Sequence, residues 1–172
     1  MTALTDKLRT RLDDLIQGVN SLEIDSVQLD ALAFEIPHTI HVLPTPWDEL
    51  SEGINCVAYA LGLIGRFEDF RDKSCNRFYA DTRFLSSLIE GGVLRPCAER
   101  EGALAVWSSA GVVLHVGLVS APGRATSKWG AGGLYEHGLF EVPKCFGEDV
   151  AFYDPVDPEV VLAYLDRFHG FE

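Results

Sequence analysis

The spacing of apolar residues changes partway along the chain, and this change limits the folds that the sequence can adopt. Over residues 4–19, leucine and isoleucine recur at helical spacing with charged residues between them, which predicts an amphipathic helix. At 103–107 and 112–119, short runs rich in β-formers replace that pattern, with Ser-Ser-Ala-Gly between them. Such a pair of runs predicts a β-hairpin. Helices followed by antiparallel strands predict an α+β fold.

The other segments are assigned from their local chemistry. Three prolines interrupt the apolar runs of 21–46, so we expect irregular chain or short strands there. Acidic and basic residues mix at 66–76, which predicts a solvated segment, and glycines at 130–133 predict a loop. Helices are predicted to begin near Cys56 and to cover 81–89 and 157–168, and strands are predicted at 124–129 and 150–153.

Composition and charge exclude several classes of function. The formal net charge of −12 disfavours nucleic acid as a partner, because an acidic surface repels phosphates, and it favours a basic partner. No apolar run reaches the roughly 18 residues that span a bilayer, and the N-terminus lacks the features of a signal peptide. We therefore expect no membrane association and a cytosolic location, with signal-less secretion as an effector as the alternative.

Cysteine and histidine spacing argues against a metal or another cofactor. The cysteines Cys56, Cys75, Cys97 and Cys145 form no CxxC pair and no regular framework, so neither a zinc knuckle nor a dense disulfide scaffold is expected. His38 and His41 lack further ligands at suitable spacing.

Cys56 and His115 are the best candidates for chemistry. Asn55 can cap a helix that begins at Cys56, and the free N–H groups of a helix start lower the pKa of a thiol. His115 lies within an apolar strand run, where a buried ring needs a partner and could take a proton from the thiol. Taken alone, each residue also has a structural explanation: a small buried cysteine and a satisfied core histidine.

A cysteine heading a helix, followed by strands that include the run HVGLV at 115–119, resembles the papain-like cysteine hydrolases. The run GALAVW at 102–107 before HVGLV is similar to the pattern of the NlpC/P60 and CHAP branch of peptidoglycan peptidases and amidases. The tract TSKWG at 126–130, followed by His137, resembles uncharacterised bacterial domains of the same fold. The resemblance covers about 47–153 and implies one papain-like domain over residues 1–172, with helical extensions at both ends.

The resemblance leaves the third catalytic position open. Ser127 stands at the spacing typical of the branch, and His137 is the alternative, from the loop after the glycines with Glu136 beside it. Ala103 replaces the aspartate usual in the branch. At the third position, serine would hold an imidazolium less firmly than the usual carboxylate or amide, and the adjacent Lys128 would repel it. Both departures weaken the case for catalysis.

Three further residues are candidates for substrate binding. Trp47 and Trp129 could line a groove, although aromatic residues at such places are more often part of the core. Asn55 could donate to an oxyanion, although capping is its simpler role, and the backbone N–H of Cys56 would serve an oxyanion hole most directly.

Two functions follow as hypotheses. The first is a thiol hydrolase that acts on an amide bond of a peptidoglycan stem peptide or a protein glutamine, with Cys56 as nucleophile, His115 as base, and Ser127 or His137 orienting the ring. The second is a catalytically inactive papain-like protein, of binding or immunity type, whose acidic surface engages a basic partner.

Overall fold

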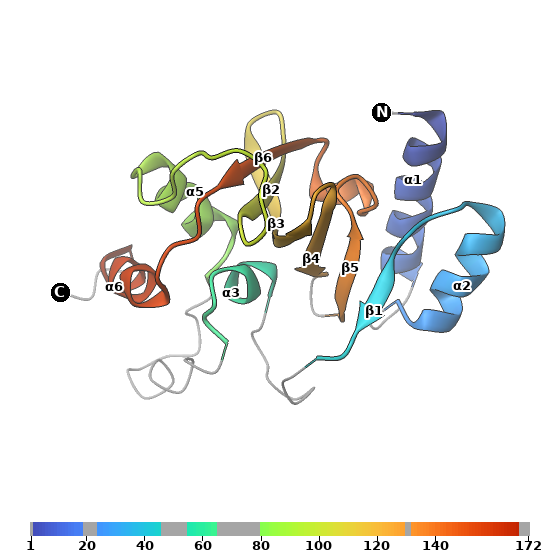
Figure 1. Ribbon diagram of the computed structural model, residues 1–172, viewed down its shortest axis with the longest axis horizontal. Coiled ribbons are helices and arrows are strands. Elements are labelled where there is room, and N and C mark those ends of the chain that lie inside the picture. Colours follow the sequence, from blue (N-terminus) through green and yellow to red (C-terminus); the bar gives the residue numbers. More distant parts are fainter. Residues whose placement is uncertain (1, 19–23, 46–54, 65–79, 130–131, 169–172) are drawn as a thin grey trace.

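The computed structural model describes residues 2–18, 24–45, 55–64, 80–129 and 132–168. Six antiparallel strands form one sheet in the order β1-β5-β4-β3-β2-β6, with helices on both sides (Figure 1). The helices are α1 (Ala3–Gly18), α2 (Ser26–Glu35), α3 (Cys56–Ala60), α5 (Thr82–Glu90), η1 (Lys144–Phe146) and α6 (Pro158–Phe168). The strands are β1 (His41–Leu43), β2 (Leu104–Ser109), β3 (Val112–Ala121), β4 (Arg124–Lys128), β5 (Leu134–Gly138) and β6 (Asp149–Tyr153). The predicted α+β class is confirmed at this level.

Helix α2 lies where irregular chain or short strands were predicted, so that prediction is wrong for Ser26–Glu35. A capping box starts the helix: the Asp25 side chain accepts from the backbone N–H of Gln28, and the Gln28 side chain accepts from that of Asp25. Leu29 and Leu32 bury one side of the helix. Pro37 follows the C-cap and disfavours further helix. Local capping and one buried stripe therefore outweigh the prolines downstream.

Strands β2 to β5 form a meander, and its first hairpin was predicted. Ala110 and Gly111 make the turn, both in the left-handed region with φ of 50° and 80°. Strand β5 was not predicted, because its five residues, which follow the predicted glycine-rich loop, are too few to show a clear alternation of apolar and polar side chains. The predicted solvated segment 66–76 lies outside the described residues.

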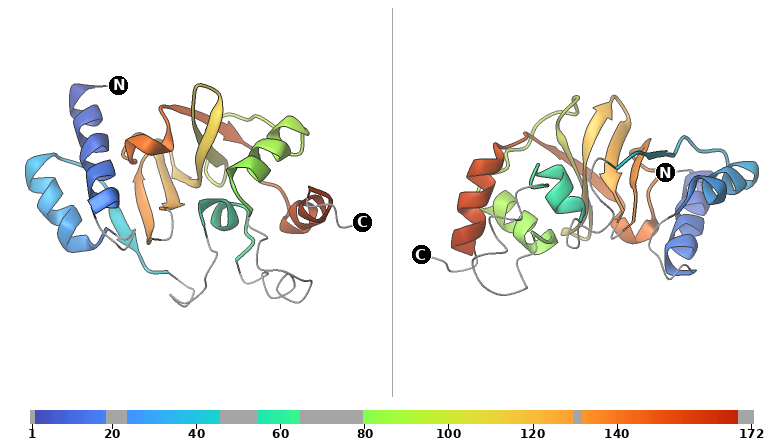
Figure 2. Two further views of the ribbon diagram at one scale, coloured as in Figure 1. Left: turned by 180° about the vertical axis from the view of Figure 1, so that it is seen from behind. Right: turned by 90° about the horizontal axis from the view of Figure 1, so that it is seen from below.

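Successive residues of each strand point to opposite faces of the sheet, and the two faces carry separate cores. The face that we call the imidazole face carries Trp107 and packs against Leu8 and Leu12 of α1 and the buried leucines of α2. The face that we call the thiol face carries Val106 and Val116 and packs against α3, α5 and α6. Figure 2 shows the sheet between the two groups of helices.

A buried arginine ties α1 to the loops beyond β5. Arg9 is fully buried, its Nε donates to the carbonyl of Val142 at 3.2 Å, and its Nη2 donates to the carbonyl of Gly147. These bonds satisfy a charge that would otherwise be costly to bury. Within the described ranges, no helix is long and apolar enough to cross a bilayer.

Candidate functional site

Cys56 is the first residue of α3, as predicted, and Asn55 fixes the start of that helix. The Asn55 Oδ1 accepts from the backbone N–H of Ala58 at 2.9 Å, and its Nδ2 donates to the carbonyl of Ala80 at 2.8 Å. The side chain therefore caps the helix and joins it to the residues before α5, which is the simpler of the two roles considered for it.

Hydrogen-bond donors and a positive charge surround the Cys56 thiol, yet burial dominates its pKa. Burial raises the pKa above the ordinary value of a thiol. The backbone N–H groups of Val116 and Val57, the N–H of Cys56 itself and the charge of Lys128 act in the opposite direction, but less strongly. The thiol is therefore protonated at neutral pH in this arrangement.

His115 lies in an aromatic environment on the other face of the sheet. Its ring stacks on Phe146 with centroids 3.9 Å apart and lies against Trp107 with centroids 5.3 Å apart. The residue is 1% exposed, and its Nε2 atom has no hydrogen-bond partner among the described residues. Burial lowers the pKa of His115 well below 6.5, and the nearby His137 lowers it further. The ring is neutral at physiological pH.

The β-sheet separates the two predicted partners. His115 pairs in register with Trp107, so both side chains point into the imidazole face. Cys56 packs against the core of the thiol face. There Val116, the residue after His115, directs its N–H toward the sulfur. No hydrogen bond or charge interaction between Cys56 and His115 is found among the described residues. The arrangement thus does not provide the nucleophile–base contact that the predicted dyad requires.

The two candidates for the orienting position are bonded to each other. The Ser127 Oγ lies 2.8 Å from the Nε2 of His137 and accepts from the Nε1–H of Trp129 at 2.9 Å. The His137 Nδ1 lies 2.9 Å from the carbonyl of Gly138, which can only accept, so we assign the ring proton to Nδ1. Nε2 then accepts from the Ser127 hydroxyl, and the chain of donors and acceptors is complete.

This network changes the roles expected of its members. His137 lies in β5 and not in a loop, and its burial lowers its pKa to about 4. The Ser127 hydroxyl donates its hydrogen bond to His137 and therefore does not orient His115. Glu136 points to the opposite face, where it contacts Arg124 at 3.4 Å and Ser120 at 3.1 Å. Within this network, neither Ser127 nor His137 supports His115 through a hydrogen bond.

Of the two tryptophans considered as groove residues, one belongs to the core and the other lies outside the described residues. Trp129 is 1% exposed and stacks on Tyr135 with ring centroids 4.4 Å apart, so it is a core residue in this arrangement. Trp47 lies outside the described residues.

Sequence reasoning missed two neighbours of the thiol. Lys128 is 4% exposed, its charge acts on Cys56, and its Nζ donates to the carbonyl of Gly132. Its alternation with Ser127 along β4 could have placed it on the thiol face. The Val116 N–H could not be identified from the sequence. Whether a backbone N–H of β3 is free to face the sulfur depends on where the pairing of β3 with β4 ends.

No metal site is formed by the side chains that the structure describes. The His38 ring is instead hydrogen-bonded to the carbonyl of Leu29 and the N–H of Ile40. No protein-family model, curated protein or solved structure matches this chain.

Proposed function

We propose that this chain is a catalytically inactive papain-like protein that binds a basic protein partner. The observation that carries the proposal is the position of the sheet between the Cys56 thiol and the His115 ring. A cysteine that heads a helix on an antiparallel meander supports the papain-like layout. The formal net charge of −12 supports a basic partner.

The burial of the imidazoles supports a structural role for them. His115, Ser127 and His137 are each at most 1% exposed, so a substrate has no access to them without opening the core. Their neighbours Trp107, Trp129 and Phe146 form an aromatic cluster around them. Ser127 and His137 are hydrogen-bonded to each other, and buried polar groups that satisfy one another make a core specific rather than reactive, while His115 has ring contacts with Trp107 and Phe146.

A thiol hydrolase acting on an amide bond is the second candidate, and the surroundings of Cys56 favour it. Backbone N–H groups and the Lys128 charge act on the sulfur in the sense that stabilises a thiolate. In this candidate the thiolate attacks the amide carbonyl, the C–N bond breaks, and the amine leaves with the proton that the thiol released. Water then hydrolyses the thioester to the free acid and restores the thiol. Peptidoglycan stem peptides and protein glutamine remain the substrates that the sequence resemblance implies.

Competitive alkylation of the thiols distinguishes the two candidates. The folded chain is treated with substoichiometric iodoacetamide at neutral pH, and each labelled cysteine is quantified by mass spectrometry. If the binding proposal holds, Cys56 reacts no faster than Cys97, which is also half-buried and whose thiol pKa is also raised by burial. Labelling of Cys56 about tenfold or more faster than Cys97 would instead establish an activated thiol and overturn the proposal.

A further inference from the structure

The outward side of α2 is apolar and uncovered. Phe34 is 94% exposed and Val27 is 73% exposed, and Ala31 between them is exposed as well. Their spacing places all three on one side of the helix, opposite the buried Leu29 and Leu32. Single exposed apolar residues are ordinary on protein surfaces, whereas a continuous stripe on one helix indicates a contact surface. We call Val27, Ala31 and Phe34 the α2 stripe.

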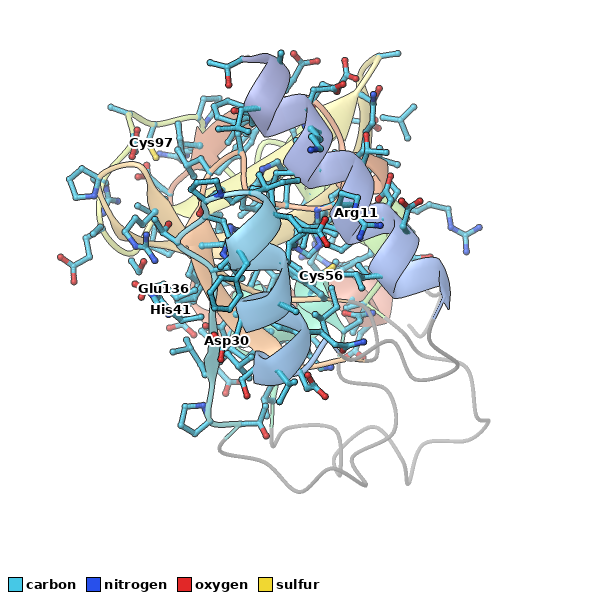
Figure 3. All side chains as sticks on the ribbon, turned by 90° about the vertical axis from the view of Figure 1, so that its right-hand side faces the viewer. Arg11, Asp30, His41, Cys56, Cys97 and Glu136 are labelled. Atoms are coloured by element: carbon cyan, nitrogen blue, oxygen red, sulfur yellow. The ribbon has the colours of Figure 1, made fainter. Side chains whose placement is uncertain are left out.

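Acidic side chains flank this stripe. Asp25, Asp30 and Glu35 are all exposed, and α2 contains no lysine or arginine. Arg11 of α1 lies beside the helix, 3.5 Å from Glu35 and 3.6 Å from Asp14. Figure 3 labels Arg11 together with Asp30 of α2. Between Arg11 and Arg66 the sequence has no further lysine or arginine, while acidic residues recur. Exposed carboxylates therefore border the stripe, and that of Glu35 is paired with Arg11.

From this combination we infer that the α2 stripe docks an amphipathic helix whose apolar residues are flanked by lysine or arginine. Two helices can pack along rows of residues spaced three and four apart, and Phe34 would be the aromatic anchor of that contact. The opposite charges would steer the partner to the site. The inference rests on the proposed binding function and names its surface and the class of its partner.

The same charges disfavour the other occupants. In a dimer through α2, the acidic rims of two copies would face each other, and like charges across an interface are costly. Anionic membranes and nucleic acids would be repelled in the same way. A basic amphipathic helix satisfies both the apolar stripe and its rim.

The test uses the full chain and a labelled peptide with leucines at helical i, i+3, i+4, i+7 spacing and lysines elsewhere. Fluorescence anisotropy compares its Kd for the native chain, for the double variant Val27→Gln, Phe34→Gln, and for Val112→Gln. The double variant keeps every charge, so general electrostatic attraction is unchanged. Val112 is 59% exposed on the β2–β3 hairpin and serves as the matched control. All three substitutions are at exposed side chains, where folding tolerates change.

We expect the double variant to weaken binding about tenfold or more, and Val112→Gln to leave the Kd unchanged. A peptide with glutamates in place of the lysines should bind at least about tenfold more weakly to the native chain. Equal affinity of the native chain and the double variant for the lysine peptide would overturn the inference. So would self-association, or binding to anionic vesicles, that depends on Phe34. Fast alkylation of Cys56 would contradict the proposed function whatever these affinities show, so the two failures are distinguishable.

Discussion

The two faces of the sheet use polar residues in different ways. On the imidazole face, Trp129, Ser127 and His137 form a continuous hydrogen-bonded chain inside an aromatic core. On the thiol face, the core is mainly aliphatic, the Lys128 charge acts on the Cys56 thiol, and Thr126 bonds to the Tyr59 hydroxyl. His115 and Val116 are adjacent in sequence but belong to different faces. A strand residue one position away from the residue that faces the thiol points to the opposite side of the sheet, where it cannot reach the sulfur.

The largest effect that distinguishes the faces should be the response of stability to acid. Burial depresses the pKa of His137 from 6.5 to about 4, so the unfolded chain binds a proton between these values that the folded chain does not. The contribution of the neutral His137 ring to the free energy of unfolding is fully present above pH 6.5 and is lost as the pH falls toward about 4. At about 1.4 kcal/mol per pKa unit, the loss is about 3 kcal/mol.

The variant His137→Gln isolates this contribution. Urea unfolding of the native chain and the variant is measured from neutral pH to about pH 4. We expect the stability advantage of the native chain to shrink by about 3 kcal/mol over that range, since glutamine does not titrate. An advantage that is independent of pH would show that His137 is not buried as a neutral ring.

A smaller contrast is expected between two neighbours on β4. Ser127→Ala removes the acceptor of the Trp129 N–H and the donor to His137 within a closed core, and we expect a loss of about 1–3 kcal/mol in the free energy of unfolding. Thr126→Val on the thiol face removes a partly buried bond to the Tyr59 hydroxyl at 2.9 Å and should cost about 0.5–1.5 kcal/mol. Equal losses, or a larger loss at Thr126, would contradict the difference between the two faces.

The smallest effect concerns the charge on the thiol face. Lys128→Met removes a positive charge that favours the Cys56 thiolate, so the thiol pKa should rise further. We expect alkylation of Cys56 at mildly alkaline pH to slow by a factor of about two to five. Alkylation of the exposed Cys145 serves as the internal control. A rate for Cys56 that does not change would show that the lysine charge does not act on the sulfur.

Much of the fold could be predicted from periodicity and capping. The amphipathic pattern of α1, the hairpin turn at Ala110 and Gly111, and the Pro158 start of α6 are local signals, and the structure agrees with each. Helix α2 was not predicted because the prolines of 21–46 indicate irregular chain, whereas the local signal for the helix is the capping box of Asp25 with Gln28. Strand β5 was missed because its pairing with β4 and β1 is not local.

The site was harder to predict because it depends on which face of the sheet each side chain occupies and on which helices pack against that face. Cys56 at a helix start and His115 in a strand were both located correctly by sequence. Which face His115 occupies follows from its register with Trp107, and the side on which α3 packs is a tertiary property. The Ser127–His137 bond likewise requires β4 and β5 to be adjacent, which no local pattern specifies.

The most direct test of this account is the titration of His115 by NMR in the native chain and in Cys56→Ala. A histidine paired with a thiolate is held in its charged form, so its pKa lies above the ordinary value and falls when the thiol is removed. The account predicts a His115 ring that is still neutral at pH 6.5 and a titration that Cys56→Ala leaves unchanged. A His115 pKa above 6.5 that drops in Cys56→Ala would contradict the separation of the thiol from the imidazole by the sheet.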